Sequence, residues 1–199
     1  MNPIALNHAQ TDLSRARAAL ERLENAGSLD AAADAWTDFL TAAGRIFTKL
    51  EQGAKTNGKS SHWFGLKKHA RKTDPLLAYI HHARNSIEHA LEDVTNKDDG
   101  GIGINFTKGG FSGDLHLDTR GPTPMFDYRS ADPENIPILK IIRPHLRLLS
   151  VRDMRAGRVY MPPTTHLGQI VDDRSPAGVA RLALRFVEQM VTEAAALPR

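Results

Sequence analysis

The chain has 199 residues, of which 41% are hydrophobic and 25% charged, and its formal net charge is +3. This composition is typical of a soluble protein with one composite domain or two small ones. Because there is no cysteine, disulfides, thiolate zinc sites and a cysteine nucleophile are excluded. No signal peptide and no membrane-spanning stretch is recognisable, so we expect a cytoplasmic protein without a membrane partner.

Two amphipathic helices are predicted at the start of the chain. Residues 5–26 carry apolar side chains at helical spacing and end at Gly27, a natural terminator. Ser28 can cap the second helix, whose apolar side runs from Ala32 to Leu50. Because only a few residues join them, the two helices should form an antiparallel hairpin.

A short basic helix is predicted next, over residues 62–72, after a polar linker and with Ser60 or Ser61 as its cap. Trp63 and Phe64 stand at its start. Because lysines are nearby, the two aromatic rings could stack on nucleic-acid bases. An aromatic pair at the start of a short helix more often anchors that helix to the core. We therefore expect an anchoring role.

The stretch 74–94 predicts one long helix, capped by Asp74 with Pro75 in its first turn. Its polar side is unusual, because two imidazoles and an amide replace the expected Lys and Glu. His81 should point to the flank, and Tyr79 should pack at an edge. The core-facing stripe holds Leu76, Leu77, Ile80, Ala83, Ile87, Leu91 and Val94, and the other face holds His82, Asn85 and His89.

A small antiparallel sheet of three to five strands is predicted over residues 98–165. Residues 102–106 and 111–117 alternate around a glycine turn and indicate a β-hairpin, and 121–137 is typical of a loop. A short strand over 138–142 and a second hairpin from 146–151 and 158–161 follow. The glycines at 100, 101 and 103 are interpreted as turn residues, because they follow a helix and no phosphate-loop motif is present.

A last helix should open at Ser175–Pro176 and dock on the helical part through an apolar side. The predicted fold is thus α+β and mainly α. It comprises a helical bundle (1–97), a small β-sheet insertion (98–165) and a C-terminal helix packing on the bundle (166–199), in one composite domain. The apolar side of the last helix holds Val179, Leu182, Phe186, Met190 and Ala194.

Arg84, Asn85 and His89 spell Arg, four residues, His, with Asn directly after the Arg. This resembles the R-x(4–6)-H signature of the HEPN superfamily, and the helical setting of residues 5–97 is similar too. The resemblance implies a HEPN-like antiparallel bundle that pairs with a second copy, so that two motifs share one cleft. Many such proteins are metal-independent endoribonucleases, and others are silent binding or regulatory modules. An antitoxin or regulatory protein is a further partner that the resemblance allows.

The three residue types suit RNA cleavage without a metal. His89 would move protons near neutral pH, Arg84 would hold the phosphate, and Asn85 would orient the imidazole. On an ideal α-helix, Arg84 and His89 diverge by about 140°, which a site shared between two protomers would repair. The alternative is a plain helix salt bridge between Arg84 and Glu88, four residues on.

Basic residues gather between Glu51 and Asp74, where there is no acidic side chain. Such a run attracts polyanions and could guide RNA, although a solvated surface is the simpler interpretation. His82 could line the same cleft. The predicted nucleic-acid contacts are therefore Lys55, Lys59, Lys67, Lys68, Arg71, Lys72 and His82.

Two other kinds of site are weaker. His82, His89 and Glu92 match no known metal-ligand spacing, so neither a metal nor a cofactor is expected. A second basic run over 140–158 could serve a DNA-associated regulator, but no helix-turn-helix signature supports it. The leading prediction is a homodimeric endoribonuclease, and the alternative is a non-catalytic module that dimerises through the same helix face.

Overall fold

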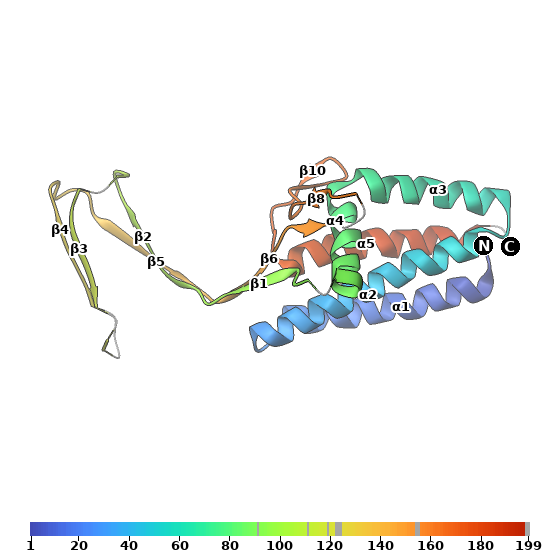
Figure 1. The fold of residues 1–199 in the computed structure, drawn as a ribbon, viewed down its shortest axis with the longest axis horizontal. Coiled ribbons are helices and arrows are strands. Elements are labelled where there is room, and N and C mark those ends of the chain that lie inside the picture. The colour runs from blue at the N-terminus through green and yellow to red at the C-terminus, as the bar shows by residue number, and fades with distance from the viewer. Residues whose placement is uncertain (91, 111, 119, 122–124, 154–155, 198–199) are drawn as a thin grey trace. The chain divides into compact units, whose positions relative to one another are not determined.

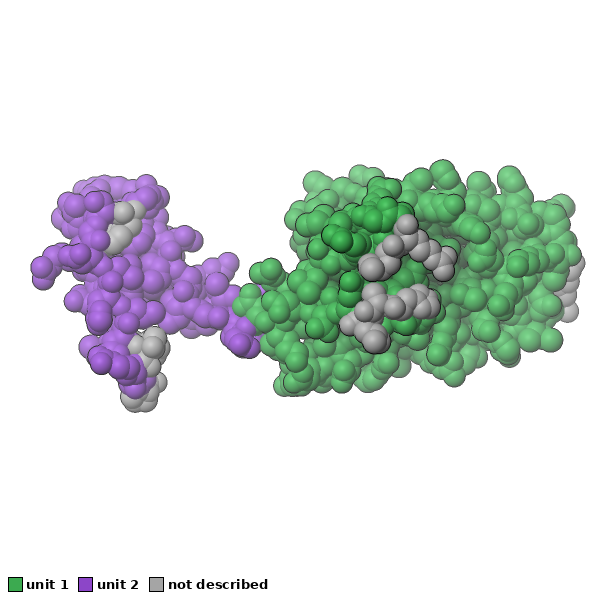
Figure 2. Space-filling view, in the orientation of Figure 1, with its two compact units in different colours: residues 1–98, 146–199 green, residues 99–145 purple. Residues whose placement is uncertain are grey.

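The computed structural model describes residues 1–199 except 91, 111, 119, 122–124, 154–155 and 198–199, and omits the side chains of residues 89 and 90. Two compact units are present (Figure 2). The first contains residues 1–98 and 146–199, and the second contains residues 99–145. The predicted α+β class is confirmed, because helices and small antiparallel strand pairs occur together.

Three helices of the first unit pack side by side (Figure 1). Helices α1 (Pro3–Glu24) and α2 (Leu29–Ala54) form the predicted hairpin, and α5 (Pro176–Ala195) lies against both. Ser28 caps α2 as expected, since its hydroxyl accepts from the Ala31 N–H at 3.1 Å. None of the helices among the described residues has the length and apolar character needed to cross a bilayer.

The hydrophobic core lies inside this helical unit. Most of its apolar side chains come from the inward faces of the helices at the spacing that the sequence predicts, and Leu148, Val151 and Val171 come from outside the helices. The largest fully buried ones are Trp36, Phe39, Leu40, Ile46, Leu50, Leu76, Tyr79, Pro163, Val171, Val179, Val187 and Met190.

Helix α3 (Gly58–Thr73) begins four residues before the predicted start. Its cap is Asn57, whose side chain accepts from the Ser60 N–H at 2.9 Å, rather than Ser60 or Ser61. Phe64 is buried, and the Trp63 indole N–H donates to the Glu193 carboxylate on α5 at 2.8 Å. The anchoring role predicted for the aromatic pair is confirmed.

The prediction of one long helix over 74–94 is wrong at its C-terminal half. Helix α4 (Pro75–Asn85) begins at the predicted cap Asp74, but a π-helical turn, η1 (Ser86–Ala90), replaces its continuation. Strand β1 (Thr95–Asp98) then pairs with β6 (His145–Leu148). The Glu92 N–H still donates to the Ser86 carbonyl, and the Val94 carbonyl then accepts from the Leu149 N–H at 2.9 Å, where the chain enters β1.

Two further short strand pairs complete the first unit and lie near α4. Strand β7 (Val151–Arg152) pairs with β8 (Val159–Tyr160), which is the end of the second predicted hairpin. Strand β9 (Thr165–His166) pairs with β10 (Gln169–Ile170). The His166 imidazole and the Leu167 N–H bond to the carboxylate of Asp74, and so hold this turn against the start of α4.

The second unit is a pair of antiparallel ribbons. Strand β2 (Gly101–Phe106) pairs with β5 (Pro137–Ile142), and β3 (Gly113–Asp118) pairs with β4 (Met125–Ser130). The predicted hairpin of 102–106 with 111–117 is therefore wrong, and the predicted loop 121–137 contains a strand. Instead of one sheet, the described strands form separate two-stranded pairs.

Asn135 contributes to the pairing of β2 with β5, together with the bonds of Thr107 to Glu134 and Ile136. Its buried side chain accepts from the Lys108 N–H at 2.9 Å and donates to the Gly110 carbonyl at 2.9 Å. These bonds tie the glycine turn to the segment before β5, so β2 continues opposite β5 rather than β3. Gly113 then starts β3 with a positive φ, where a Cβ would collide with the Arg129 carbonyl.

Apolar side chains of the second unit remain exposed. Cross-strand pairing places Ile102 opposite Ile141 and Ile104 opposite Leu139 on one face, because paired residues share a face. Ile141 is 80% exposed, and none of the described residues between 99 and 145 belongs to the buried core of the helical unit.

Candidate functional site

The predicted catalytic residues lie where α4 passes into the π-turn. Arg84 extends from α4 toward α2 and packs on Gly44, where an added Cβ would stand 3.3 Å from the Arg84 Nε. Glycine inside a helix costs about 0.5–1 kcal/mol relative to alanine. A side chain at position 44 would take up space that Arg84 fills, which is a physical reason for glycine at this position.

A row of hydrogen bonds joins three side chains of α4. The Arg84 Nη1 donates to the Asn85 Oδ1 at 3.2 Å, and the Asn85 Nδ2 lies 3.4 Å from the His81 Nε2. Since the amide oxygen faces a guanidinium, the amide nitrogen faces His81 and donates to it. This arrangement requires His81 to carry its proton on Nδ1.

His81 is uncharged at neutral pH. Burial lowers the pKa of His81 to about 4, and the positive charges of Arg71 and Arg84 act in the same direction. A neutral ring can accept from Asn85, which agrees with the hydrogen bond. The expectation that His81 points away to the flank is wrong, because a residue and its neighbour four positions on meet on a helix.

Arg84 also forms the ion pair that the sequence offered as an alternative. Its Nη2 lies 2.5 Å from the Glu88 Oε2, and both side chains are about one-third exposed or less. The predicted salt bridge is confirmed. Glu88 therefore competes with any anion for the same guanidinium.

The π-turn changes the geometry expected for Arg84 and His89. In a π-helix the backbone bonds run between residues five apart rather than four, and Arg84 lies in α4 just before this turn, so the ideal α-helical separation does not apply to the pair. The backbone of His89 lies inside this turn. Its side chain is outside the described residues, as is residue 91, so its contacts form no part of the geometry.

Arg71 was assigned to RNA guidance, but its side chain faces inward. Its guanidinium lies 4.8 Å from the centroid of the Phe47 ring, and burial lowers the pKa of Arg71. Together with His81, Arg84 and apolar side chains, it lines a cavity of about 20 Å³, room for one water. The inward position of Arg71 had no signal in the sequence.

His82 packs on β8 rather than facing an open cleft. Its ring stacks on Tyr160 with 3.9 Å between centroids, and its Nδ1 lies 3.9 Å from the Asp153 Oδ2. Burial lowers the pKa of His82, the charge of Asp153 opposes this, and that of Arg158 adds to it. Tyr160, Asp153 and Arg158 are neighbours that the sequence did not indicate, because they come from a distant hairpin.

Some lysines of the predicted basic run form ion pairs, and others are exposed. Lys67 pairs with Glu193 at 2.6 Å and Lys68 with Glu51 at 2.9 Å, so both help to fix α3. Lys55, Lys59 and Lys72 are exposed. Of the second basic run, Lys140 and Arg143 lie in the second unit, and residue 155 is outside the described part of the chain.

No protein-family model, curated protein or solved structure matches this chain. The site is therefore interpreted from its own geometry. Within the described residues, no three His, Cys, Asp or Glu side chains gather as metal ligands would. The described groups offer a guanidinium that is less than one-third exposed, an amide held in one orientation and a neutral imidazole hydrogen-bonded to it.

Proposed function

We propose that this protein is a metal-independent endoribonuclease of HEPN type that acts as a homodimer. The supporting observation is the hydrogen-bonded row of Arg84, Asn85 and His81, directly before a π-turn that contains the backbone of His89. A cation and an oriented amide next to a histidine position suit phosphodiester chemistry, in which His89 would transfer protons. π-turns are also frequent at functional sites.

In the proposed reaction His89 accepts the proton of a ribose 2′-hydroxyl. The 2′-oxygen then bonds to phosphorus while the bond to the 5′-oxygen breaks, and the leaving oxygen takes a proton from a general acid. The products are a 2′,3′-cyclic phosphate and a free 5′-hydroxyl. Arg84 stabilises the charge on phosphorus oxygens once it exchanges Glu88 for phosphate. The second protomer supplies the general acid, its own His89.

The test is cleavage of RNA by the purified chain in EDTA. We expect His89→Ala to lower the rate at least 100-fold, the usual contribution of a general acid–base residue. His62→Ala serves as the control, because His62 is an exposed histidine on α3. Unchanged melting temperatures would establish that both variants are folded, and cleavage by folded His89→Ala would disprove the proposal.

A second function is favoured by the Arg84–Glu88 ion pair. A guanidinium already neutralised at 2.5 Å is a poor phosphate ligand but a good structural group. In that case the same helix face would join two protomers without catalysis. Sedimentation distinguishes the two, because Arg84→Ala should then weaken the dimer while wild-type protein leaves RNA intact.

A further inference from the structure

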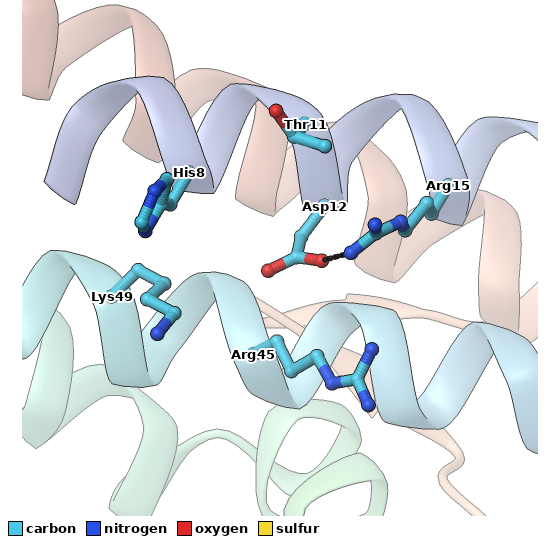
Figure 3. Close-up of a pocket in the computed structure, with 6 residues that line it drawn as sticks. All are labelled: His8, Thr11, Asp12, Arg15, Arg45 and Lys49. Carbon is cyan, nitrogen blue, oxygen red and sulfur yellow. Dashed lines mark hydrogen bonds and ion pairs between the residues drawn. The ribbon is translucent and has the colours of Figure 1, made fainter. Parts of the chain in front are cut away.

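A second hollow lies between α1 and α2, and it shares no lining residue with the cavity beside Arg84. Its volume is about 360 Å³, within the range of small-molecule sites. Figure 3 shows four lining side chains on α1 and two on α2, with the Asp12 carboxylate directed toward α2. The lining residues are His8, Thr11, Asp12, Arg15, Arg45 and Lys49.

Positive charge exceeds negative charge in this hollow. Arg15, Arg45 and Lys49 are cationic, and Asp12 is the single carboxylate among the lining residues. The Asp12 Oδ1 pairs with the Arg15 Nη1 at 2.7 Å (Figure 3). Within the described residues, Arg45 and Lys49 have no ion pair or hydrogen bond, so two cationic charges remain uncompensated.

The placement of these charges is unfavourable for an isolated surface. Arg45 and Lys49 are four residues apart on α2, where like charges repel, although Glu at either position would have relieved the repulsion. Asp12 is 3% exposed on the face of α1 that packs on α2, where a carboxylate loses hydration. An anion bound by both Arg45 and Lys49 would remove the repulsion between these two side chains.

The carboxylate restricts what kind of anion fits. Asp12 has a second oxygen that can accept a hydrogen bond, and the Thr11 hydroxyl already donates to the Asn7 carbonyl at 3.1 Å, which leaves it as an acceptor. A ligand for this hollow needs a doubly charged group for Arg45 and Lys49, and hydroxyl donors for Asp12 and Thr11. A phosphate monoester carries close to two negative charges at neutral pH.

We propose that the hollow binds a small hydroxyl-bearing phosphate monoester, such as a sugar phosphate. Arg45 and Lys49 bind the phosphate, Arg15 stays on Asp12, and Asp12 accepts from a sugar hydroxyl. This site is separate from the proposed ribonuclease site, so neither proposal depends on the other.

Isothermal titration calorimetry of the full chain tests this with ribose 5-phosphate, inorganic phosphate and ribose as probes. We expect ribose 5-phosphate to bind more tightly than phosphate, and ribose not to bind. Arg45→Gln and Lys49→Gln should each weaken binding at least tenfold, and Asp12→Asn should bring ribose 5-phosphate down to the affinity of phosphate.

Arg185→Gln is the matched control, because Arg185 is an exposed arginine on α5 and its loss changes the net charge equally. Equal weakening by Arg185→Gln would overturn the proposal, as would the absence of saturable heat at millimolar ribose 5-phosphate. If an RNA oligonucleotide binds through Arg45 and Lys49 and ribose 5-phosphate does not compete, the small-ligand proposal is also wrong.

Discussion

Asn85 connects the two kinds of group at the candidate site, because one end of its amide faces Arg84 and the other faces His81. The amide is thereby fixed in one orientation, which a free surface asparagine would not be. The row depends on the charge state of His81, since a protonated ring cannot accept from Asn85. Acidification should therefore break the hydrogen bond between Asn85 and His81 first.

His81 should make the folded state sensitive to acid. Its pKa falls from 6.5 to about 4 on folding, so between these values the unfolded chain binds more protons and stability declines as pH falls. The full loss is about 3 kcal/mol. His81→Gln keeps an acceptor for Asn85 but cannot titrate, so urea unfolding across this range should show a smaller decline.

His62→Gln is the control for that measurement, because it removes an exposed histidine from α3. If His81→Gln and wild type lose the same stability between neutral and acidic pH, the assignment of this loss to His81 is wrong. A reduced decline in His62→Gln would contradict it equally.

At the scale of elements, Asp74 joins α4 to the β9–β10 hairpin. Its carboxylate accepts from the Leu77 N–H at 2.9 Å, the Leu167 N–H at 2.6 Å and the His166 Nδ1 at 3.0 Å. Burial alone would raise the pKa of Asp74, but these hydrogen bonds outweigh it, and the pKa lies below its ordinary value. One side chain thus starts the helix and holds the hairpin on it.

Asp74→Ala should lower the free energy of unfolding by about 2–4 kcal/mol, because the cap is lost and buried donors are left unpaired. Asp74→Asn keeps one acceptor oxygen and should cost less. Chemical denaturation measures both. A loss below about 0.5 kcal/mol in Asp74→Ala, the size of an ordinary surface substitution, would contradict this role.

The helices could be predicted from the sequence, whereas the strand partners could not. Caps such as Ser28 and Asp74 act within one turn, and the apolar spacing of a helix is local, so both are visible in sequence. The turn that follows β2 is bonded to Asn135, just before β5, and Asn135 lies far along the chain from that turn. A glycine turn at 108–110 therefore indicated a hairpin that does not form.

Part of the candidate site was visible in the sequence and part was not. The Arg84–Glu88 pair follows from helical spacing and was expected. The π-turn was not, since residues 86–90 are compatible with an α-helix and only the departure of the chain toward β1 distinguishes them. Nor could sequence place Arg71 and Tyr160 beside the two histidines, because both belong to other elements.

At the scale of the whole molecule, the helical unit should fold without residues 99–145. Among the residues of that segment that the structure describes, none has a side chain in the buried core. Replacing it with a short glycine-containing linker between Asp98 and Leu146 should leave the melting temperature within about 4 °C, which corresponds to roughly 1 kcal/mol at this size. Circular dichroism and thermal melting test this.

The control is the same linker in place of residues 165–170, which should destabilise the protein because it removes the partners of Asp74. A shortened chain that lost its helical signal after excision of 99–145 would show that the ribbons support the helices. Dye binding should also fall on that excision, since the ribbons carry exposed side chains such as Ile141.

The π-turn has a consequence for how a two-residue motif is recognised. A π-turn closes over five residues where an α-turn closes over four, so two residues at a fixed separation point in different relative directions in the two kinds of turn. The same two residue types at the same separation can hence orient their side chains differently in two proteins. Pattern searches that count only the intervening residues will group such proteins together, although the motif side chains contact different neighbours.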